Sequence, residues 1–311
     1  MLDVTSKALF HGLAQVSTLQ RFASRFGMRR GGFARRFIAG ETVDEAIEAV
    51  ADLPSKGLGL TLDYLGESVA SGDAAAAAAA DYVGIIGKIV ASGIERNISL
   101  KLTQLGLDVD RATAVDNMRR ILEPADAGGF FVRIDMENSP YTDATISILE
   151  TLRQQGHTAI GTVIQTCLKR SEGDIRRLNA LGAGVRLVKG AYKEARPVAY
   201  QHKSEVDAAF VDLMHLLLDQ GTYPAIATHD PVMIAATKAY AKSKGHASDR
   251  FEFQMLYGIR RDLQAALVAE GYRVRVYVPF GQQWYPYFMR RLGERPANVA
   301  FVLRGLVSDR S

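Results

Sequence analysis

Short apolar runs alternate with longer amphipathic segments along most of the chain. The short runs have strand length, and the segments between them repeat apolar positions with helical spacing. Eight strands are predicted, at residues 58–64, 98–102, 130–136, 158–165, 184–189, 225–228, 251–255 and 273–278. In the eighth run Val alternates with other residues, and we expect Pro279 and Gly281 to end the strand.

A helix-sized segment follows each predicted strand, at residues 73–92, 110–125, 142–155, 173–181, 205–220, 231–244, 260–270 and again after residue 281. Asp110 and Thr142 are predicted N-caps, and Pro231 stands at a position typical of a first helical turn. Glycines follow most of these segments, as is common where a helix ends.

This repeated order predicts a closed (β/α)8 barrel of the TIM type. An open doubly wound sheet is the alternative, but no G-x-G-x-x-G pattern follows the first strand. Residues 1–57 are predicted to form an N-terminal helical arm, with helices near residues 6–25 and 42–53. We expect one domain, in which residues 58–311 form the barrel.

Composition is that of an ordinary globular protein, with 311 residues, 48% hydrophobic and 23% charged. The single cysteine, Cys167, excludes an intramolecular disulfide and a cysteine-based metal site, and it fits a reducing, cytoplasmic compartment. The net charge of +4 comes without a basic run interleaved with aromatic residues, so no nucleic-acid partner is expected.

Targeting signals are not evident in the sequence. The N-terminus lacks a secretory signal, and the most apolar helix, near residues 74–91, contains Asp81 and Lys88 and is predicted to fall short of a membrane span. The basic cluster at residues 29–36 fits either a solvated loop or contact with an acidic or lipid surface.

Polar residues collect at the predicted strand ends, where a barrel of this kind carries its active site. Each of them alone has a structural interpretation, such as a buried ion pair or a hydrogen-bonded core histidine. Together they predict a strongly cationic mouth that binds a phosphate-bearing cofactor and a small acidic substrate, and they are Lys101, Asp135, Gln165, Arg186, Lys189, His229, Arg290 and Arg291.

The last predicted helix places Tyr287, Arg290, Arg291 and Glu294 on one face, at i, i+3, i+4 and i+7. One interpretation is a solvated basic face with an internal Arg–Glu pair. The other is a clamp for a carboxylate or phosphate, because the guanidinium fork suits bidentate anion binding. The position after the eighth strand favours the clamp.

The ordered motifs ISLKLTQLG, RIDMENSPY, VIQTCLKR, VRLVKGAYKE, ATHDP, FEFQMLYG and the segment Tyr287–Arg291 resemble the proline dehydrogenase family, in its short monofunctional bacterial form. The resemblance implies an FAD-dependent (β/α)8 barrel that oxidises L-proline to Δ1-pyrroline-5-carboxylate and passes electrons to a membrane quinone. It also makes a peripheral contact with the inner face of the membrane plausible.

The same resemblance implies roles for individual residues. Lys101, Arg290 and Arg291 would pair with the proline carboxylate, Asp135 would pair with Lys101 near the substrate, and Glu294 would support the arginines. Leu187, Tyr277 and Tyr287 would pack on the ring. Asp135 and Arg186 would be catalytic, with Arg186 near the reactive flavin nitrogen. FAD would contact Met136, Gln165, Arg186, Lys189, Gly190, Ala191, Thr228 and His229.

Two rival functions stay open on sequence grounds. A strand lysine, Lys189 or Lys101, beside an anion clamp is also typical of a Schiff-base lyase or aldolase. A non-catalytic barrel that serves as a binding module is the second rival, although the density of charge at the strand ends argues against it.

Overall fold

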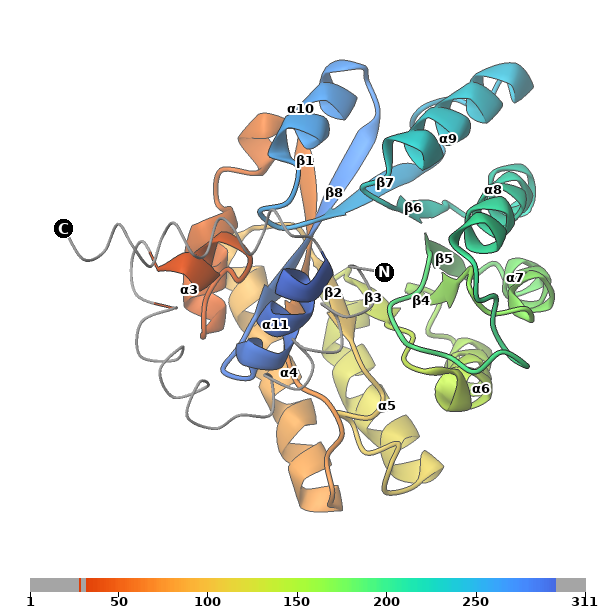
Figure 1. Cartoon of the computed structure of the whole chain (residues 1–311). Coiled ribbons are helices and arrows are strands. Elements are labelled where there is room, and N and C mark those ends of the chain that lie inside the picture. The colour runs from red at the N-terminus through yellow and green to blue at the C-terminus, as the bar shows by residue number, and fades with distance from the viewer. Residues whose placement is uncertain (1–27, 29–31, 295–311) are drawn as a thin grey trace.

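Eight parallel strands close into a barrel in a computed structural model that describes residue 28 and residues 32–294 (Figure 1). The order around the barrel follows the chain, from β1 to β8, and β8 pairs with β1. The strands are β1 (Leu58–Tyr64), β2 (Asn97–Leu100), β3 (Phe131–Ile134), β4 (Ile160–Gln165), β5 (Gly184–Val188), β6 (Ala225–Ala227), β7 (Glu252–Leu256) and β8 (Arg273–Phe280).

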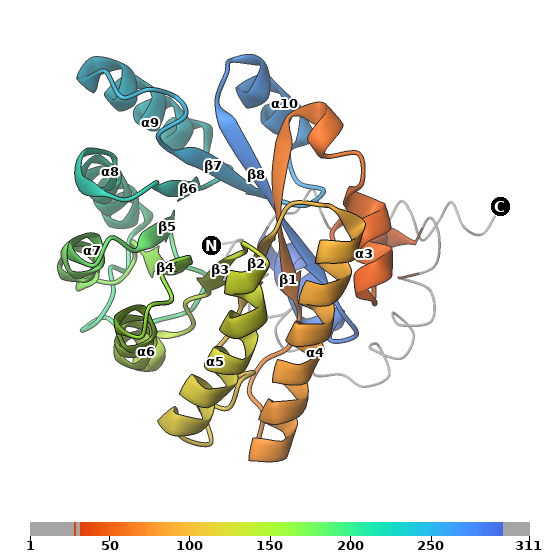
Figure 2. The same cartoon turned by 180° about the vertical axis from the view of Figure 1, so that it is seen from behind.

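Helices form a ring outside the strands, as the reverse view also shows (Figure 2). They are α4 (Gly72–Ser92), α5 (Arg111–Ala127), α6 (Thr142–Gln154), α7 (Ser171–Ala180), α8 (Lys203–Gln220), α9 (Pro231–Lys244) and α10 (Arg261–Ala269). The side chains of Asp110 and Asp230 accept hydrogen bonds from first-turn amides of α5 and α9, which confirms Asp110 as a cap.

The main core lies between the strands and this ring. Outward-facing strand residues such as Leu60, Leu62 and Ile134 pack there with helix residues such as Ile86 and Leu149, all at most 2% exposed. The barrel interior is polar instead, since alternate residues of a strand point to opposite faces. Thr61, Ser99, Arg133, Arg186 and Gln254 are buried there.

The predicted barrel is confirmed, with two local corrections. The eighth strand does not stop at Pro279 but runs on to Phe280. Pro279 lies beyond the last β8 residue paired with β7, Tyr277, and its carbonyl accepts a bond from the Ala39 amide. Helix α6 begins at Thr142, so the N-cap is Tyr141 and not Thr142.

Among the described residues, three short elements precede the first strand: the 3-10 turn η1 (Phe33–Arg36), helix α3 (Val43–Val50) and the 3-10 turn η2 (Pro54–Lys56). Helix α3 contacts α4 and β8, so it fills the place in the ring that the last helix would otherwise take. Of the predicted arm, residues 6–25 lie outside the described part of the chain.

The last helix, α11 (Trp284–Glu294), lies over one end of the barrel and not in the ring (Figures 1 and 2). A second apolar cluster holds it, in which Trp284, Tyr285 and Phe288 pack against Phe37 and Ile38. The Trp284 indole donates a 3.0 Å hydrogen bond to Glu41. Because α11 follows β8 directly, it covers the C-terminal ends of the strands, which form the barrel mouth.

Helix α4 is long and apolar enough, by length and composition, to cross a membrane, contrary to the prediction. It nevertheless packs along α5, and Ala75, Tyr82, Ile85 and Ile89 are buried in the core. Core helices of globular proteins pass the same test. Helix α4 is therefore described here as a barrel helix.

The opposite end of the barrel contains a cavity of about 560 Å³. Arg275 closes it on one side by bonding Glu252 at 2.8 Å and Glu95 at 2.6 Å. Arg133 donates to the carbonyls of Thr162 and Gly184, and burial lowers its pKa to about 9. The arginines at this end are therefore bonded to carboxylates and strand carbonyls of the barrel itself.

Candidate active site

Arg186, on β5, lies at the centre of the mouth, where it bonds to side chains on β2, on β7 and directly after β3. Its guanidinium donates to Gln254 at 2.5 Å, to Asp135 at 2.7 Å and to Ser99 at 3.0 Å. The ring of Tyr277 lies 5.1 Å from its central carbon. Three of the five N–H groups of an arginine are used in these bonds, which fix the guanidinium and leave donors available to a ligand.

Asp135 accepts from both Arg186 and Tyr277. The Tyr277 hydroxyl donates to the second carboxylate oxygen at 2.8 Å. Burial, with Asp135 and Asp63 nearby, raises the pKa of Tyr277 well above its usual range. Tyr277 is therefore a neutral donor at the barrel mouth, and Asp135 accepts from it and from Arg186.

Lys101 follows β2 and is 7% exposed. Its ammonium lies 3.8 Å from a carboxylate oxygen of Asp63, at the end of β1. The expected pair between Lys101 and Asp135 is wrong, because Asp135 is bonded to Arg186 and Tyr277. Burial would lower the pKa of Lys101, but the carboxylates of Asp63, Asp135 and Glu67 outweigh it and raise that pKa.

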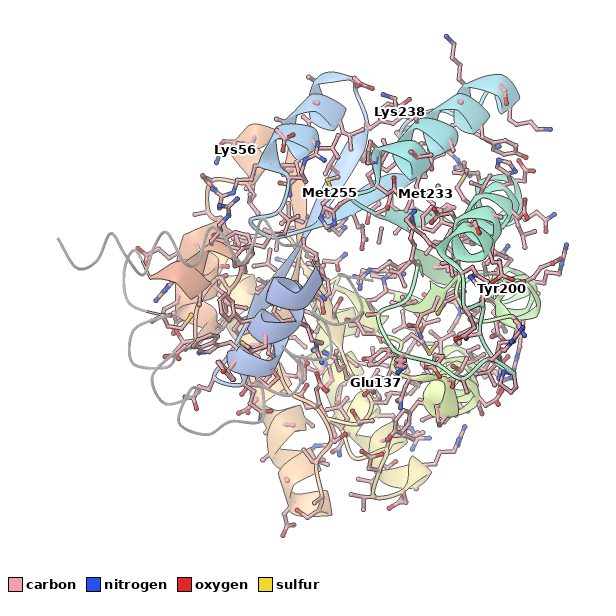
Figure 3. The ribbon with its side chains drawn as sticks, in the orientation of Figure 1. Lys56, Glu137, Tyr200, Met233, Lys238 and Met255 are labelled. Atoms are coloured by element: carbon pink, nitrogen blue, oxygen red, sulfur yellow. The ribbon has the colours of Figure 1, made fainter. Side chains whose placement is uncertain are left out.

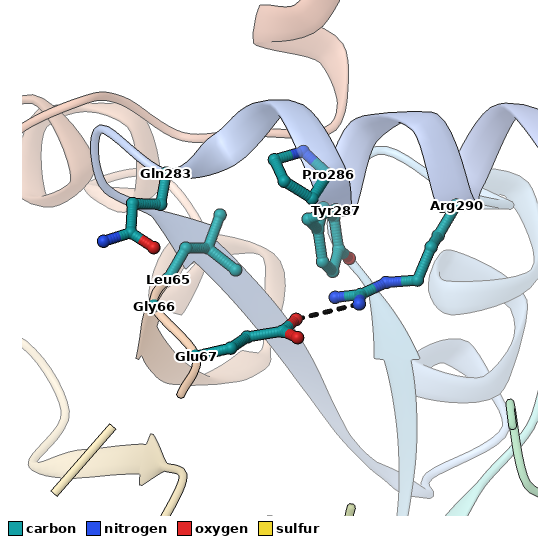
Figure 4. Close-up of a pocket in the computed structure, with 7 residues that line it drawn as sticks. All are labelled: Leu65, Gly66, Glu67, Gln283, Pro286, Tyr287 and Arg290. Atoms are coloured by element: carbon teal, nitrogen blue, oxygen red, sulfur yellow. Dashed lines mark ion pairs between the residues drawn. The ribbon is translucent and has the colours of Figure 1, made fainter. Parts of the chain in front are cut away.

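Helix α11 brings Tyr287 and Arg290 to a small pocket of about 120 Å³ at the mouth (Figure 4). Arg290 forms a 2.8 Å ion pair with Glu67, in the loop after β1. Arg291 lies with its guanidinium carbon 5.1 Å from the Tyr287 ring. The backbone of Glu294 ends α11, but its side chain lies outside the described part of the structure, so its predicted role stays a prediction.

Tyr192 interacts electrostatically both with Lys101, after β2, and with Arg290, on α11. Burial and the nearby Glu67 raise its pKa to about 12, while Lys101 and Arg290 oppose the rise. The structure thus brings Lys101 and Arg290, from opposite ends of the sequence, toward one region that Tyr192 and Glu67 share.

Lys189 follows β5 and lies between two carboxylates. Its ammonium bonds Asp207 at 2.5 Å and Asp230 at 2.7 Å, and Lys203 adds a second cation to both. Although burial alone would raise the pKa of Asp230, the bond from Lys189 holds it below its ordinary value. The cluster is electrically balanced.

The remaining predicted cofactor residues lie along the ends of β3 to β6. Gln165 ends β4 and donates to the Glu137 carbonyl at 2.8 Å, and Glu137, labelled in Figure 3, accepts from Thr103. The His229 Nε2 accepts from the Leu256 amide at 3.0 Å. Neighbouring positions are Met136 and Thr228, both buried, and Gly190 and Ala191, both exposed.

Leu187 does not line the mouth in this structure, and its predicted contact with the substrate ring stays a prediction. It is fully buried in the main core. Its neighbour Arg186 points into the barrel, and alternation turns Leu187 toward the helices. Leu256, half-buried at the end of β7 and packed with Tyr277 beside the second cluster, is the better candidate.

The mouth is not strongly cationic, contrary to the prediction. Its cations are neutralised by carboxylates that the sequence analysis did not single out, namely Asp63 and Glu67 near β1 and Asp207 and Asp230 near β6 and α8. Asp63 carried the same signal as Asp135, a charge in an apolar strand. Glu67 and Asp207 lie in a loop and a helix, where an acidic residue is unremarkable.

Comparisons with known proteins agree with this arrangement. The proline dehydrogenase family profile matches residues 46–304. The chain belongs to the proline dehydrogenase family. Proline dehydrogenase 1 of Bacillus subtilis (strain 168) is 44% identical over 96% of this chain and 98% of its own length. The proline dehydrogenase of Deinococcus radiodurans is 43% identical over 88% of this chain and 90% of its own.

The fold comparison gives the same result. Proline utilization A (PutA) from Bdellovibrio bacteriovorus, inactivated by N-propargylglycine, superposes with a TM-score of 0.80 at 27% identity. The match covers 90% of this chain and 34% of that longer one. The predicted family and the TIM barrel are both confirmed, and proline dehydrogenases are oxidoreductases of proline catabolism.

Proposed function

We propose that this proline dehydrogenase oxidises L-proline to Δ1-pyrroline-5-carboxylate with FAD and passes the electrons to a quinone. The observation that carries the proposal is the grouping of Lys101, Arg186, Tyr277 and Arg290 at one barrel mouth in a chain of this family. Transfer to a lipid-soluble quinone would bring a cytoplasmic protein into peripheral contact with the inner face of the membrane.

The substrate carboxylate is held by Lys101, Arg290 and Arg291. Arg290 and Lys101 are each beside a carboxylate, Glu67 and Asp63, so the substrate competes with a partner that is already present. Tyr277 and Tyr287, with Leu256 in place of Leu187, pack on the apolar ring. Binding an anion between fixed cations orients the ring for reaction.

FAD would be held along the ends of β3 to β6. The donor chemistry fits a polar ring system, because Arg186 retains unused N–H groups and the Gly190 and Ala191 backbone is exposed. Met136, Gln165, Thr228 and His229 complete that side of the mouth. Lys189 lies between Asp207 and Asp230, whose charges neutralise its own. Its contribution to FAD binding is therefore to hold these carboxylates in place, and it adds little net positive charge.

FAD, when bound, supplies the two-electron acceptor for a hydride from the carbon next to the proline nitrogen. The nitrogen also loses a proton, and a C=N bond forms, so the substrate loses two electrons and two protons in total. Arg186, fixed by Asp135, Ser99 and Gln254, places positive charge where negative charge develops.

The geometry disfavours a Schiff-base lyase. A nucleophilic lysine must be neutral, which requires a lowered pKa. Lys189 is bonded to two carboxylates, and the carboxylates around Lys101 raise its pKa. Lys101 is therefore held as an ammonium ion, and Lys189 is engaged in two ion pairs.

The visible spectrum of the purified full-length protein tests the proposed function. We expect flavin absorbance that bleaches when L-proline is added without oxygen and returns when a soluble quinone is added. A colourless protein, or a yellow one that proline leaves unchanged, would contradict the proposal. Trapping of a carbonyl substrate by borohydride would support the lyase instead.

Steady-state kinetics test the carboxylate clamp. Arg290→Ala and Arg291→Ala should each raise KM for proline about 10- to 100-fold, since a hydrogen bond to a charged group contributes about 1.5–3 kcal/mol. The FAD content should stay unchanged. Arg260→Ala, which removes a partly exposed arginine bonded to Asp262, is the matched control and should leave KM unchanged.

A further inference from the structure

Asp63 is a buried carboxylate without a hydrogen bond. It is 0% exposed, and neither of its oxygens meets a donor in hydrogen-bond geometry among the described residues. Burial raises the pKa of Asp63, while Lys101 and the nearby Tyr277 hydroxyl, which bonds Asp135, oppose the rise. The nearest cation is the ammonium of Lys101, at 3.8 Å. Burying a charged carboxylate without a hydrogen bond costs free energy of folding. This cost suggests that the carboxylate of Asp63 serves the active site and not stability.

The neighbours of Asp63 are committed to other partners. Asp135 is bonded to Arg186 and Tyr277, at 2.7 and 2.8 Å. Glu67, the third carboxylate near Lys101, forms its 2.8 Å ion pair with Arg290. Of the three carboxylates that act on Lys101, Asp63 is thus the one with no other cation bonded to it within the described chain.

We propose that Asp63 is a positioning residue that keeps Lys101 charged and in place for the substrate carboxylate. The inference rests on the proposed role of Lys101 in binding that carboxylate. Lys101 is itself 7% exposed, and burial favours a neutral amine. A fixed negative charge at 3.8 Å opposes this effect without occupying the N–H groups of Lys101 in a hydrogen bond.

The long distance is part of the argument. A lysine ammonium has three N–H groups and accepts none. A tight bond to Asp63 would use one of them and point it away from the ligand. At 3.8 Å the pair keeps its electrostatic attraction, and Asp63 does not take up an N–H group of Lys101 in a hydrogen bond.

Several titratable groups face this pair, and they define the pH range in which it can be tested. Lys101 faces Asp63, Glu67, Asp135 and Tyr192, and Asp63 faces Lys101, Asp135, Arg186, Tyr277 and Tyr82. Burial raises the pKa of Tyr192 to about 12 and those of Tyr82 and Tyr277 well above their usual range. These tyrosines therefore stay neutral between about pH 7 and pH 9.5.

The test uses the FAD-loaded full-length enzyme and cyclopentanecarboxylate as a competitive inhibitor. This ring carboxylate lacks an amine, so its own charge does not change over that range. For the wild type we expect a Ki that stays constant from about pH 7 to pH 9.5, because Lys101 remains charged throughout. A wild-type Ki that rises across the range would overturn the proposal without any variant.

Asp63→Asn removes the charge at nearly constant volume. Asp63 is the largest of the charges that offset the burial of Lys101, so without it the folded-state pKa of Lys101 falls and the ammonium is lost at lower pH, although Asp135 and Glu67 remain. We expect the ratio of variant to wild-type Ki to increase at least about 10-fold from pH 7 to pH 9.5. The charged form of Lys101 decreases about 10-fold for each pH unit above its pKa. A ratio that is raised but constant over this range would assign Asp63 a purely structural role.

Asp63→Ser serves as a second neutral variant if the asparagine does not fold. Adding Lys101→Arg to Asp63→Asn should restore a constant Ki ratio, since arginine stays charged. Leu62→Met, at the neighbouring buried position of the same strand that faces the helices, is the matched control and should behave as the wild type. Lys101→Ala distinguishes the two hypotheses, because an unchanged Ki there removes the clamp role itself.

Discussion

At the scale of the residue, the active site consists of charges that already have partners. Arg186 is bonded to Asp135, Arg290 to Glu67, and Lys189 to two carboxylates. Arg186 and Asp135 form the most buried of these pairs, and removing one of the two leaves the other buried without an opposite charge beside it. Single charge-removing variants here are therefore expected to disturb both binding and stability, and they need matched controls.

Gly190 is a residue whose backbone the fold uses directly. Its φ of +108° is rarely adopted by residues with a side chain, and an added Cβ would overlap the sulfur of Cys167. We expect Gly190→Ala to lower the free energy of unfolding by about 1–3 kcal/mol and to weaken FAD retention, because the strain displaces the loop after Lys189. Chemical denaturation and flavin release measure both effects.

Gly173 provides the contrast for that experiment. It lies inside helix α7, and an added Cβ would meet nothing within 4 Å. Gly173→Ala should raise the free energy of unfolding by roughly 0.5–1 kcal/mol, because alanine restricts the unfolded chain and favours helix. If both substitutions changed stability in the same direction, the conformational argument at Gly190 would fail.

At the scale of the element, α11 is held apart from the barrel ring. Its apolar residues pack in the second cluster with Phe37 and Ile38, and the amide of Gly281 donates to the Gly40 carbonyl. The segment before β1 therefore fixes the helix that carries Arg290 and Arg291. A substitution in that segment can therefore alter substrate binding although the substituted residue does not lie at the barrel mouth.

Trp284→Ala tests this separation. The indole is 1% exposed in the second cluster, and its loss should cost about 3–5 kcal/mol there. We expect faster hydrogen exchange for α11 amides and a higher KM for proline, while the amides of β1 to β8 keep their protection. Phe253→Ala, in the main core, should lower protection throughout the barrel. Equal loss in both variants would contradict an independent α11.

At the scale of the whole molecule, the barrel was predictable because its signals are local. Apolar strand runs, helix caps such as Asp110 and stops such as Gly245 lie within a few residues of the structure they specify. The polar strand ends were found in the same way, and Lys101, Asp135 and Arg186 do gather at one mouth.

What the sequence did not predict depends on contacts between distant segments. The partner of Lys101 is Asp63 and not Asp135, a choice made by the arrangement of neighbouring strands. The role of Leu187 was implied only by the family resemblance, and alternation beside the inward-facing Arg186 turns Leu187 toward the helices. The second cluster joins Met28, Ala34, Phe37 and Ile38 to α11, and no local pattern signals that contact.

The pairing of β1 with β8 also sets an order of events during synthesis. Leu58 pairs with Val274 and Tyr64 with Phe280, so the edge of β1 has no strand beside it until most of the chain has been made. At translation rates of about 5–20 residues per second, that wait lasts roughly 10–40 s. Helix α11, with Arg290 and Arg291, leaves the ribosome later still. Until β8 is made, the growing sheet therefore has two unpaired edges, one at β1 and one at the strand synthesised last, and the substrate-binding arginines of α11 are still absent.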